Sequence, residues 1–480
     1  MTPAFAVAAD DGVPLVVDVD GTLIRTDLLH EASLLFLASH PFEAPRLALW
    51  LSRGKATLKS QLAARVAPAI ERLPLRAETM ERIRAAQAAG RPVYLASASE
   101  ETYVAPLGQA IGGIAGVFAT DATRNLAGDA KATCLVEAFG AGGFDYIGDQ
   151  PVDVPVWRQA RRQLIVAHGS GFERRMQRTF PQAEVIARPR ITPRSIVKTL
   201  RAHQWSKNAL LFLALIVGHR FDVATVVATL LAFVAFCAAA SSAYIINDLM
   251  DIQNDRVHPR KRLRPLPAGD LPIPIGIAMS VGLLTLALAI AATLPLMFLA
   301  VLLLYVVVTL AYSLVLKRKA IVDVLTLAGL YTLRVYAGLT AGALTSSQWL
   351  PMFSLFLFLC LAIEKRCSEL VRRREAGEGR LQGRNYRVID LSILFPLAAA
   401  AGYGAVFVVA LYLSSDEVRH LYTHPNVLWL ICPLLLYWIS RVLILSNRNE
   451  MHDDPIVFAL TDRISWYVVA SAMVVIGAAI

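Results

Sequence analysis

The sequence is poor in charged residues and in cysteine. Only 18% of its 480 residues are charged, whereas 56% are hydrophobic, a larger share than soluble globular proteins usually carry. The five cysteines show no CxxC spacing, and three of them lie within apolar runs, which argues against a disulfide framework and against a zinc site. We therefore expect much of the chain to lie in lipid.

The N-terminus lacks the basic-then-apolar pattern of a signal peptide, so we expect the first part of the chain to stay in the cytoplasm. Long apolar stretches begin only after about Ala209, which predicts a soluble domain over residues 1–190 and a membrane domain over 191–480. The net charge of +10 gathers in short loops between apolar stretches, as the positive-inside rule predicts. We therefore predict no nucleic-acid partner.

The soluble part contains three short apolar runs, each of which ends in polar residues. In parallel α/β sheets, ligands bind at the carboxyl ends of the strands, so polar residues there are well placed for chemistry. Taken alone, an Asp-x-Asp-Gly sequence is also typical of a simple turn, and Ser and Lys are common at strand ends. The polar residues in chain order are Asp18, Asp20, Ser97, Lys131, Asp149 and Asp153.

This order of motifs resembles the haloacid dehalogenase (HAD) superfamily of phosphohydrolases over nearly the whole soluble part. The resemblance implies an α/β, Rossmann-like domain in which Asp18 is the nucleophile and Asp20 the general acid and base. Ser97 and Lys131 would hold the phosphoryl oxygens. Asp149 would bind Mg²⁺ together with the Asp18 carboxylate and the Asp20 carbonyl, with Asp153 supporting this shell.

About seventy residues between the first two motifs have helical periodicity and predict a helical cap that selects the substrate. The cap carries Arg53, Lys55, Lys59 and Arg65. These cations suit a substrate with more than one phosphate. A helix face that is simply exposed to solvent would account for the same basic residues equally well.

Nine apolar stretches in the second part predict an all-α polytopic bundle of about nine membrane helices. Five Lys or Arg residues lie in the loop 251–269, eight lie in 365–390, and the alternate loops hold almost none, which predicts a cytoplasmic N-terminus and cytoplasmic active sites. The stretches are 207–221, 223–246, 271–293, 295–316, 321–341, 348–364, 391–413, 426–446 and 464–480.

The second of these stretches ends in the sequence NDLMDIQND, where Asp248, Asp251 and Asp255 have the i, i+3, i+7 spacing of one helix face. Three carboxylates at a membrane boundary repel one another unless a cation pairs with them. We therefore predict one or more Mg²⁺ ions here, bridging to a diphosphate, although a solvated helix end would also give this pattern.

This motif and the basic residues after it resemble the UbiA superfamily, in which NDxxDxxxD binds the diphosphate of a donor through Mg²⁺. Residues 201–208, residues 312–317 with Asp323 and Arg334, and Lys365 and Arg366 with Glu369 show a finer resemblance. They resemble the decaprenyl-phosphate phosphoribosyltransferase branch, which uses phosphoribosyl diphosphate (PRPP) as donor. The second Asp-rich motif of standard prenyltransferases, DxxxD, is not evident, because only Asp323 remains after Lys317. Lys317, Lys365 and Arg366 also lie where topology alone places cations. The substrate-binding residues implied are Lys207, Asn247, Arg256, Lys261, Arg262, Arg264, Tyr312, Lys317, Asp323, Arg334, Lys365 and Arg366.

The sequence thus predicts a bifunctional membrane enzyme. Its transferase part would move 5-phosphoribose from PRPP to polyprenyl phosphate, and its phosphatase part would remove the 5-phosphate. One alternative is an aromatic prenyltransferase with an unrelated phosphatase, and another makes the soluble domain a non-catalytic scaffold. The expected partners are the two substrates and the lipid bilayer, and homo-oligomerisation is left open.

Overall fold

The computed structural model describes most of the chain, and its packing divides the chain into two compact units. The first unit comprises Met1–Arg201 and Tyr244–Ser280, and the second comprises Ala202–Ala243 and Val281–Ile480. The described residues are 12–121, 125–167, 169–187, 191–218, 220–343, 348–381, 384–416, 418, 422–451, 458–459 and 461–479.

The first unit contains a six-stranded sheet with strand order β3-β2-β1-β4-β5-β6, in which all neighbours are parallel. A parallel sheet brings the carboxyl ends of its central strands to one edge, so the polar residues after β1, β2 and β4 meet there. The strands are β1 (Leu15–Val17), β2 (Val93–Glu100), β3 (Gly116–Thr120), β4 (Asp145–Gly148), β5 (Arg162–Val166) and β6 (Glu184–Ile186).

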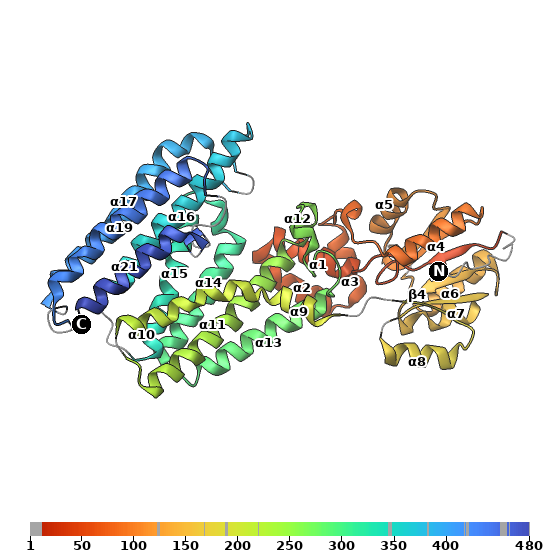
Figure 1. Ribbon diagram of the computed structural model, residues 1–480. Coiled ribbons are helices and arrows are strands. Elements are labelled where there is room, and N and C mark those ends of the chain that lie inside the picture. Colours follow the sequence, from red (N-terminus) through yellow and green to blue (C-terminus); the bar gives the residue numbers. More distant parts are fainter. Residues whose placement is uncertain are drawn as a thin grey trace, which may run out of the picture. The chain divides into compact units, whose positions relative to one another are not determined.

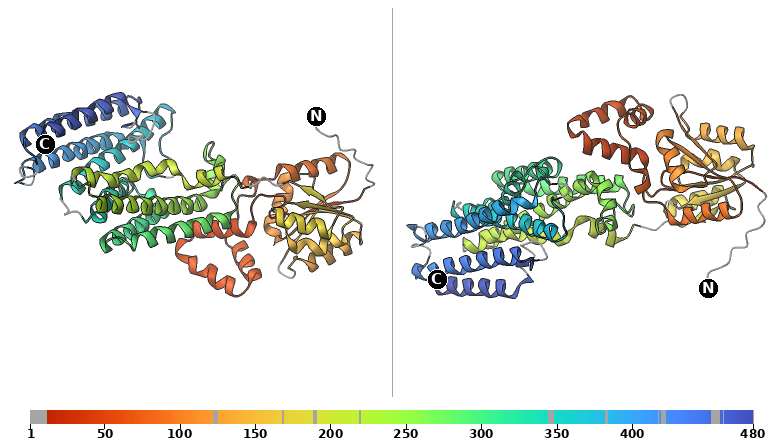
Figure 2. Two further views of the ribbon diagram at one scale, coloured as in Figure 1. Left: turned by 60° about the horizontal axis from the view of Figure 1, so that its bottom comes forward. Right: turned by 90° about the horizontal axis from the view of Figure 1, so that it is seen from above.

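Helices cover both faces of this sheet because alternate residues of each strand point to opposite sides. In β1, Val17 packs in one apolar core with residues of α4 and α5, whereas Val16 packs in another with residues of α6, α7 and α8. Figures 1 and 2 show the strands as a layer between helices. The covering helices are α4 (Ala77–Ala88), α5 (Glu101–Ile111), α6 (Asp129–Phe139), α7 (Val154–Gln159) and α8 (Ser170–Thr179).

The predicted cap is present between β1 and β2 and is helical. The Asp27 carboxylate accepts hydrogen bonds from the amides of Leu29 and His30 and so caps the first cap helix. Phe36, Leu58 and Leu62 from the cap share the apolar core of the sheet. The cap helices are α1 (Leu28–Ser39), α2 (Ala44–Ser52) and α3 (Lys55–Ala63), with short 3₁₀ turns η1 (Pro41–Glu43) and η2 (Ile70–Arg72).

The first unit also contains a segment from far along the chain. It runs from the last residues of α11 (Val223–Met250) through α12 (Ile252–Val257) and the 3₁₀ turn η5 (Lys261–Leu263) to the start of α13 (Ile273–Ala291). Helix α9 (Pro193–Leu200) lies in the same unit, and Lys198 Nζ donates to the carbonyl of Leu263 at 2.5 Å.

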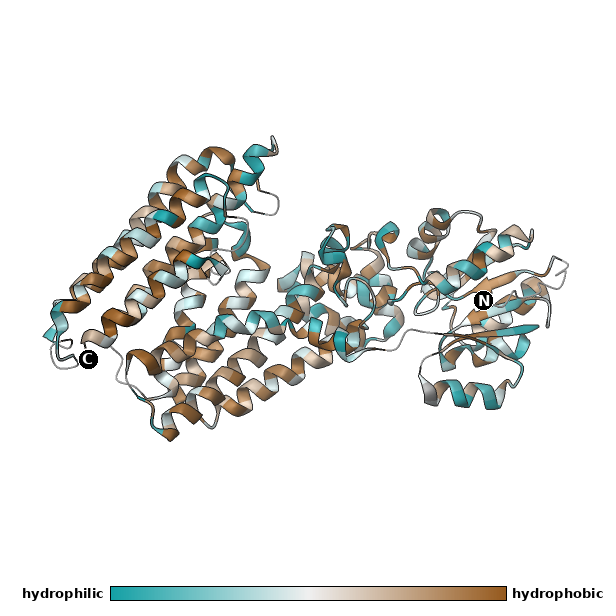
Figure 3. Ribbon diagram, viewed as in Figure 1, coloured by the Kyte–Doolittle hydropathy of each residue, from teal (hydrophilic) through white to brown (hydrophobic). Residues whose placement is uncertain are grey.

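The second unit is all helical, as predicted, and Figure 3 shows apolar residues along the length of its helices. All nine predicted stretches contain helix, but only six described segments are both long and apolar enough to span a membrane, so the count of nine is not confirmed. The remaining elements, beyond α11 and α13, are η4 (Ala202–Phe212), α10 (Leu213–Val217), α14 (Leu296–Leu314), η6 (Leu316–Arg318), α15 (Val322–Ala341), α16 (Trp349–Glu375), η7 (Val388–Asp390), α17 (Leu391–Leu413), η8 (Pro425–Leu430), α19 (Ile431–Asn447) and α21 (Arg463–Ala479).

Three of the nine predicted stretches are not long and apolar enough to span a membrane, and the reason is clear for each. Segment η4–α10 is short and largely 3₁₀, and α21 has only 17 residues. Helix α16 is long, but its second half carries a row of charged residues that begins at Glu364. Length and charge, both readable from the sequence, therefore separate these segments from the other six.

Candidate active sites

Three carboxylates gather at the carboxyl edge of the sheet. Asp18 follows β1, Asp149 follows β4, and Asp153 ends the turn η3 (Pro151–Asp153). One oxygen of each lies within 4.8 Å of the others, and no other such trio of metal-binding side chains occurs among the residues that the structure describes. The sheet therefore brings together three of the residues that the sequence assigned to the phosphatase.

Lys131, in the first turn of α6, lies among these carboxylates and is itself buried. Its Nζ donates to Asp18 Oδ1 at 2.8 Å, to Asp153 Oδ1 at 3.2 Å and to the Tyr146 hydroxyl at 3.0 Å. Burial alone would lower the pKa of Lys131, but the adjacent Asp18, Tyr146 and Asp153 together raise this pKa well above its usual value. The lysine therefore stays charged and serves as a fixed cation beside Asp18.

Burial dominates the electrostatics of Asp18 itself. It raises the pKa of Asp18 to about 7, against the opposing effect of Lys131. Without Lys131 the carboxylate would take up a proton more readily and would lose its nucleophilicity. The ion pair thus favours the ionised form of the buried Asp18.

Asp20 lies at the same edge but has different partners. Its Oδ1 accepts the backbone N–H of Leu28 at 2.7 Å, and its Oδ2 accepts Ser99 Oγ at 2.6 Å and Ser97 Oγ at 3.3 Å. Burial raises the pKa of Asp20 to about 6. A carboxyl group with this pKa exchanges a proton near neutral pH, which suits a general acid and base.

The donor set at this edge fits Mg²⁺, which prefers carboxylate and carbonyl oxygens. Close backbone approach supports the arrangement, because Gly21 has φ +74° and a Cβ there would lie 2.2 Å from Asp149 Oδ2. Only glycine fits at that position. The Gly in the Asp-x-Asp-Gly motif therefore lets Asp149 lie against the loop that carries Asp18 and Asp20.

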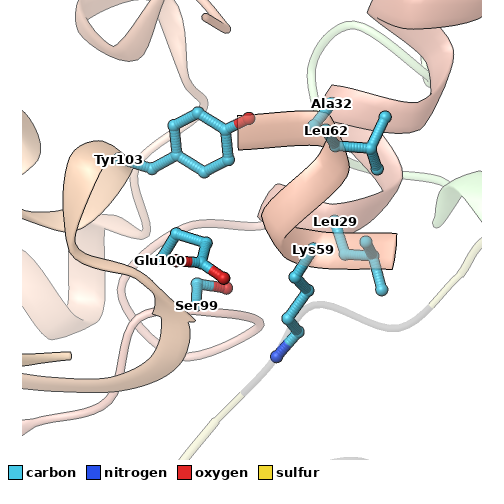
Figure 4. A pocket seen from close by; sticks show the side chains of 7 residues that line it. All are labelled: Leu29, Ala32, Lys59, Leu62, Ser99, Glu100 and Tyr103. Carbon is cyan, nitrogen blue, oxygen red and sulfur yellow. The ribbon is translucent and has the colours of Figure 1, made fainter. Parts of the chain in front are cut away.

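A small pocket lies between the cap and the end of β2 (Figure 4). The cap contributes Lys59 and three apolar side chains, and the core contributes Ser99, Glu100 and Tyr103. Lys59 Nζ donates to the carbonyl of Ala98 at 2.6 Å, which fixes this cation next to the Ser97–Ser99 segment. The pocket thus combines one cation and one carboxylate with an apolar wall, and its apolar cap residues are Leu29, Ala32 and Leu62.

The predicted acidic helix face is bent in the structure. Helix α11 ends at Met250, Asp251 is the N-cap of α12, and the two helices are not one continuous element. Hydrogen bonds from the amide of Asp251 to the Asn247 carbonyl and from the amide of Asp255 to the Asp251 carbonyl carry the helical repeat across the bend. The three carboxylates therefore do not lie on one uninterrupted helix, as was predicted, although the helical hydrogen-bond repeat continues across Asp251.

Cations bridge two of these three carboxylates. Arg264 Nη1 lies 3.0 Å from Asp248 Oδ1 and 2.6 Å from Asp255 Oδ2, so one guanidinium joins both. Arg201 also pairs with Asp248, and Lys261 Nζ lies 3.3 Å from Asp255 Oδ1. Oxygen donors of this kind suit Mg²⁺, but it is arginine that bridges Asp248 and Asp255 here.

The other predicted residues of this segment have varied positions. Asn247 is partly buried near the end of α11, and Arg262 is exposed. Arg256 turns away from Asp255 and makes a bidentate ion pair with Glu31 of the cap, at 2.6 and 3.0 Å. The structure therefore gives Arg256 a protein partner where the sequence suggested phosphate.

In the second unit, Asp323 begins α15 and is fully buried between two arginines. Arg366 Nε lies 3.1 Å from Asp323 Oδ2, and Arg384 Nη1 lies 2.7 Å from the same oxygen. Arg384 also donates to the Tyr312 hydroxyl at 3.4 Å, and Arg366 pairs with Glu369 at 2.6 Å. Three predicted residues, Tyr312, Asp323 and Arg366, thus share one polar cluster.

Arg334, in the middle of α15, is buried at a second polar position of this unit. Its Nε donates to Asn208 Oδ1 at 2.9 Å and its Nη2 to the Tyr305 hydroxyl at 2.9 Å. Its guanidinium also lies over the ring of Tyr331, as does the ammonium of Lys207, at 5.3 and 5.9 Å from the centroid. The two predicted cations Lys207 and Arg334 therefore share one aromatic neighbour.

Lys317 and Lys365 are the remaining predicted cations of the second unit. Lys317 lies in η6 and Lys365 in α16, and both are partly buried. Their predicted contact with phosphate stays a prediction.

Several residues of these sites escaped the sequence analysis. Ser99, Tyr146, Glu31 and Arg384 have no motif of their own, and only Ser99 had a usable signal, the repeated serine after β2. Arg201 was given no role of its own in the sequence-based prediction. Glu31 and Arg384 meet their partners across 225 and 61 residues, and Tyr146 meets Lys131 across 15, so no short spacing reveals these contacts.

Comparison with family models matches both parts of the chain. Residues 208–466 match the UbiA prenyltransferase family, and residues 15–158 match haloacid dehalogenase-like hydrolases.

The chain is also similar to individual proteins, over its whole length or over part of it. The chain is 34% identical to an uncharacterized protein of Sinorhizobium fredii, over 97% of this chain and 91% of that protein. It is 30% identical to a decaprenyl-phosphate phosphoribosyltransferase of Mycolicibacterium smegmatis, over 59% of this chain and 92% of that protein. A solved UbiA homolog from Archaeoglobus fulgidus, bound to DMAPP and Mg²⁺, is 19% identical over 59% of this chain and 99% of that chain, with a TM-score of 0.44.

Proposed function

The chain belongs to the UbiA prenyltransferase family and carries an N-terminal haloacid dehalogenase-like domain, and we propose that it is a bifunctional phosphoribosyltransferase and phosphatase. Its membrane part transfers 5-phosphoribose from PRPP to a polyprenyl phosphate such as decaprenyl phosphate. Its soluble part then removes the 5-phosphate and leaves polyprenyl-phosphoryl-ribose.

Two observations support PRPP as the donor. The relative from Mycolicibacterium smegmatis is named a decaprenyl-phosphate phosphoribosyltransferase, and the match spans 92% of it. In addition, Asp323 is the acidic residue left where a second Asp-rich motif would be expected, and Arg366 and Arg384 neutralise it. A single carboxylate, with leucine at position 327 where the second acid of DxxxD would lie, is poorly suited to hold a second metal ion for a prenyl diphosphate.

In the transfer step, an oxygen of the polyprenyl phosphate attacks the anomeric carbon of PRPP. The bond from that carbon to the diphosphate breaks, and the diphosphate leaves with the electron pair. The attacking phosphate is already anionic, so the step needs no strong general base. The Mg²⁺ that Asp248, Asp251 and Asp255 would hold supplies charge neutralisation for the departing diphosphate.

The cations of the acidic segment have a specific task in this step. Arg201, Lys261 and Arg264 pair with Asp248 and Asp255 in the structure. When the diphosphate is present, these side chains exchange their carboxylate partners for phosphate oxygens. The exchange keeps each cation paired and lets it stabilise the negative charge that develops on the leaving group.

In the hydrolytic step, Asp18 attacks the phosphorus of the 5-phosphate, and the bond to the ribose oxygen breaks. Asp20 donates a proton to that oxygen, and an aspartyl-phosphate forms on Asp18. Asp20 then takes a proton from the attacking water, which restores Asp18 and releases phosphate. Lys131 and Ser97 stabilise the phosphoryl oxygens throughout, and Asp18, Asp149 and Asp153 would hold Mg²⁺.

The observation that carries the bifunctional proposal is the completeness of the phosphatase site. A scaffold has no use for a buried Lys131 paired with Asp18, or for a carboxyl group at Asp20 whose pKa burial raises to about 6. The product of the transferase still carries a 5-phosphate, which gives the attached phosphatase a substrate. Tethering also raises the effective concentration of that substrate.

The residues that line the pocket beside Asp20 have the chemistry to contact the phosphate and the nearest hydroxyls of the substrate. Lys59 supplies a cation for the phosphate, and Glu100 offers carboxylate oxygens to sugar hydroxyls. The apolar cap residues exclude water around them.

We also place both active sites on the cytoplasmic side, because the basic loops lie in the same segments as the predicted substrate-binding residues.

Incubation of the purified protein with Mg²⁺, ribose-labelled PRPP and decaprenyl phosphate, followed by lipid extraction, tests the transferase. Label in the lipid phase is expected, and it should depend on decaprenyl phosphate. A parallel reaction with a prenyl diphosphate and an aromatic acceptor is the comparison. Turnover of that pair alone would show that the chain is an aromatic prenyltransferase instead.

A further inference from the structure

A buried ion pair between segments far apart in the chain joins Glu31 and Arg256 in the first unit. Arg256 Nη2 lies 2.6 Å from Glu31 Oε1, and Nη1 lies 3.0 Å from Oε2, so the pair is bidentate. The side chains are 0% and 5% exposed, and 225 residues of chain separate them. Thr26 Oγ1 also donates to Glu31 Oε1, at 2.8 Å. Both carboxylate oxygens of Glu31 are therefore satisfied.

On the side of the soluble domain, Glu31 belongs to the cap helix α1 that borders the phosphatase pocket. Its neighbours Leu29 and Ala32 line that pocket. The amide of Leu28, at the start of the same helix, donates to Asp20. The Glu31 carboxylate is thus attached to an element whose position affects the phosphatase site.

On the other side, Arg256 follows directly after Asp255 in the acidic motif. Arg256 Nε donates to the carbonyl of Pro267 at 3.0 Å and so closes the loop that also carries Lys261 and Arg264. Those two cations pair with Asp255. The ion pair with Glu31 therefore fixes a loop that carries both the acidic motif and its cations.

Close packing around the pair shows that the contact is extensive. Gln253 Oε1 accepts the amide of Ala69 at 3.2 Å, and Arg25 Nη1 lies 3.2 Å from Asp270 Oδ1. Gly269 has φ +72°, and a Cβ there would lie 2.6 Å from Cβ of Arg25. The loop 252–271 thus packs against the cap and the loop after β1 along its length.

We propose that Glu31 is a positioning residue of the transferase. By holding Arg256, it fixes the segment that carries Asp255, Lys261 and Arg264 in the geometry that binds the metal and diphosphate of the donor. The phosphatase domain is then a structural part of the transferase site as well as a second enzyme. This inference rests on the proposed function for the identity of the donor, and the contact itself does not depend on it.

The chemistry of the pair favours a positioning role over simple adhesion. A buried ion pair adds little stability compared with apolar packing, but it accepts only one arrangement of its partners. An arginine fork meets a carboxylate in one plane through two hydrogen bonds, which fixes orientation as well as distance. Such a contact sets the register of a loop better than apolar side chains do.

The test compares Glu31→Gln, which removes the charge at nearly constant volume, with Arg25→Gln, which removes an exposed pair on the same surface. Both are made in the Asp18→Asn background, so that hydrolysis does not alter the lipid product. For Glu31→Gln, the Mg²⁺ concentration for half-maximal transfer and the KM for PRPP should rise about 10- to 100-fold, as when residues that orient metal ligands are lost. Arg25→Gln should change either value less than about twofold, the scale expected of an exposed pair.

The charge-swapped protein Glu31→Arg with Arg256→Glu should recover part of the lost affinity, because it restores a pair of opposite charges. A general loss of folding would instead lower the amount of active protein and leave KM unchanged. Equal KM and Mg²⁺ requirement in Glu31→Gln and the parent would overturn the proposal.

Amide hydrogen exchange of the loop 252–271 in the full chain gives a readout without any substrate. Glu31→Gln should exchange faster there than the parent, whereas Arg25→Gln should not. Unchanged exchange in Glu31→Gln overturns the proposal whichever donor is used. Faster exchange in a protein that does not consume PRPP retains the positioning role and shows that the donor was misidentified.

Discussion

Replacement of Lys131 by methionine should silence the phosphatase while the fold persists. Methionine keeps the volume and removes the charge that lies 2.8 Å from Asp18 Oδ1. At an effective dielectric constant of about 20, a pair at this distance interacts by about 6 kcal/mol, and relaxation of the site would reduce that. Loss of half of this energy, about 3 kcal/mol, corresponds to a decrease of about 150-fold in rate.

The assay is release of phosphate from a small phosphomonoester, measured from pH 5 to 9 at saturating Mg²⁺. Because Lys131 opposes the effect of burial on the pKa of Asp18, its loss should raise that pKa further and move the acid limb of the profile to higher pH. Lys55→Met, an exposed cap lysine, is the matched control and should behave as the parent. A rate within about fivefold of the parent with an unmoved acid limb would refute the role assigned to Lys131.

Three further outcomes are expected. Asp248→Asn or Asp255→Asn should abolish labelling of lipid from PRPP and leave phosphomonoester hydrolysis intact, and loss of both activities in a well-folded variant would contradict two separate sites. Raising Mg²⁺ should move the acid limb of hydrolysis to lower pH, since the metal competes with protons for Asp18, whose pKa burial raises to about 7; a limb that ignores Mg²⁺ would count against Asp18 as a ligand. Asp323→Asn leaves Arg366 and Arg384 without their shared carboxylate and should destabilise the membrane part by about 3 to 5 kcal/mol, seen as a lower melting temperature in detergent.

In the soluble domain, the order of the motifs along the chain was enough to predict which polar residues come together in the fold. Short apolar runs that end in polar residues predicted strands whose carboxyl ends meet, and the sheet does bring Asp18, Ser97 and Asp149 to one edge. Parallel topology makes this inference safe, because strand direction alone fixes which ends converge. The roles of these residues in catalysis remain predictions.

The contacts of Glu31 and Arg384 show what the sequence could not reveal. Each side chain meets its partner across a long separation in the chain, and nothing in local periodicity signals such a pair. The break at Asp251 was missed for a different reason. An i, i+3, i+7 pattern fits a continuous helix and a helix with a one-residue bend equally well, because the hydrogen-bond repeat is kept through the bend.

The predicted number of nine membrane spans is not confirmed, because the prediction counted apolar stretches without testing the length and charge of each helix. Six described segments satisfy both criteria, and α16 fails because Glu364, Lys365 and Arg366 follow its apolar half. Charge near a helix end is also what a substrate site at the membrane boundary requires. The charged part of α16 that excludes this helix from the six segments therefore also carries two predicted substrate-binding residues, Lys365 and Arg366.

The most direct test of the bifunctional account is the lipid product of the parent protein and of Asp18→Asn, each incubated with Mg²⁺, PRPP and decaprenyl phosphate. Asp18→Asn keeps the shape of the side chain but removes the nucleophile, which costs on the order of 8 kcal/mol when the covalent route is lost. We predict that the variant accumulates phosphorylated lipid-linked ribose, whereas the parent releases phosphate and yields the dephosphorylated lipid. If both proteins yield the same phosphorylated lipid and no phosphate, the soluble domain acts on another substrate and the bifunctional account is wrong.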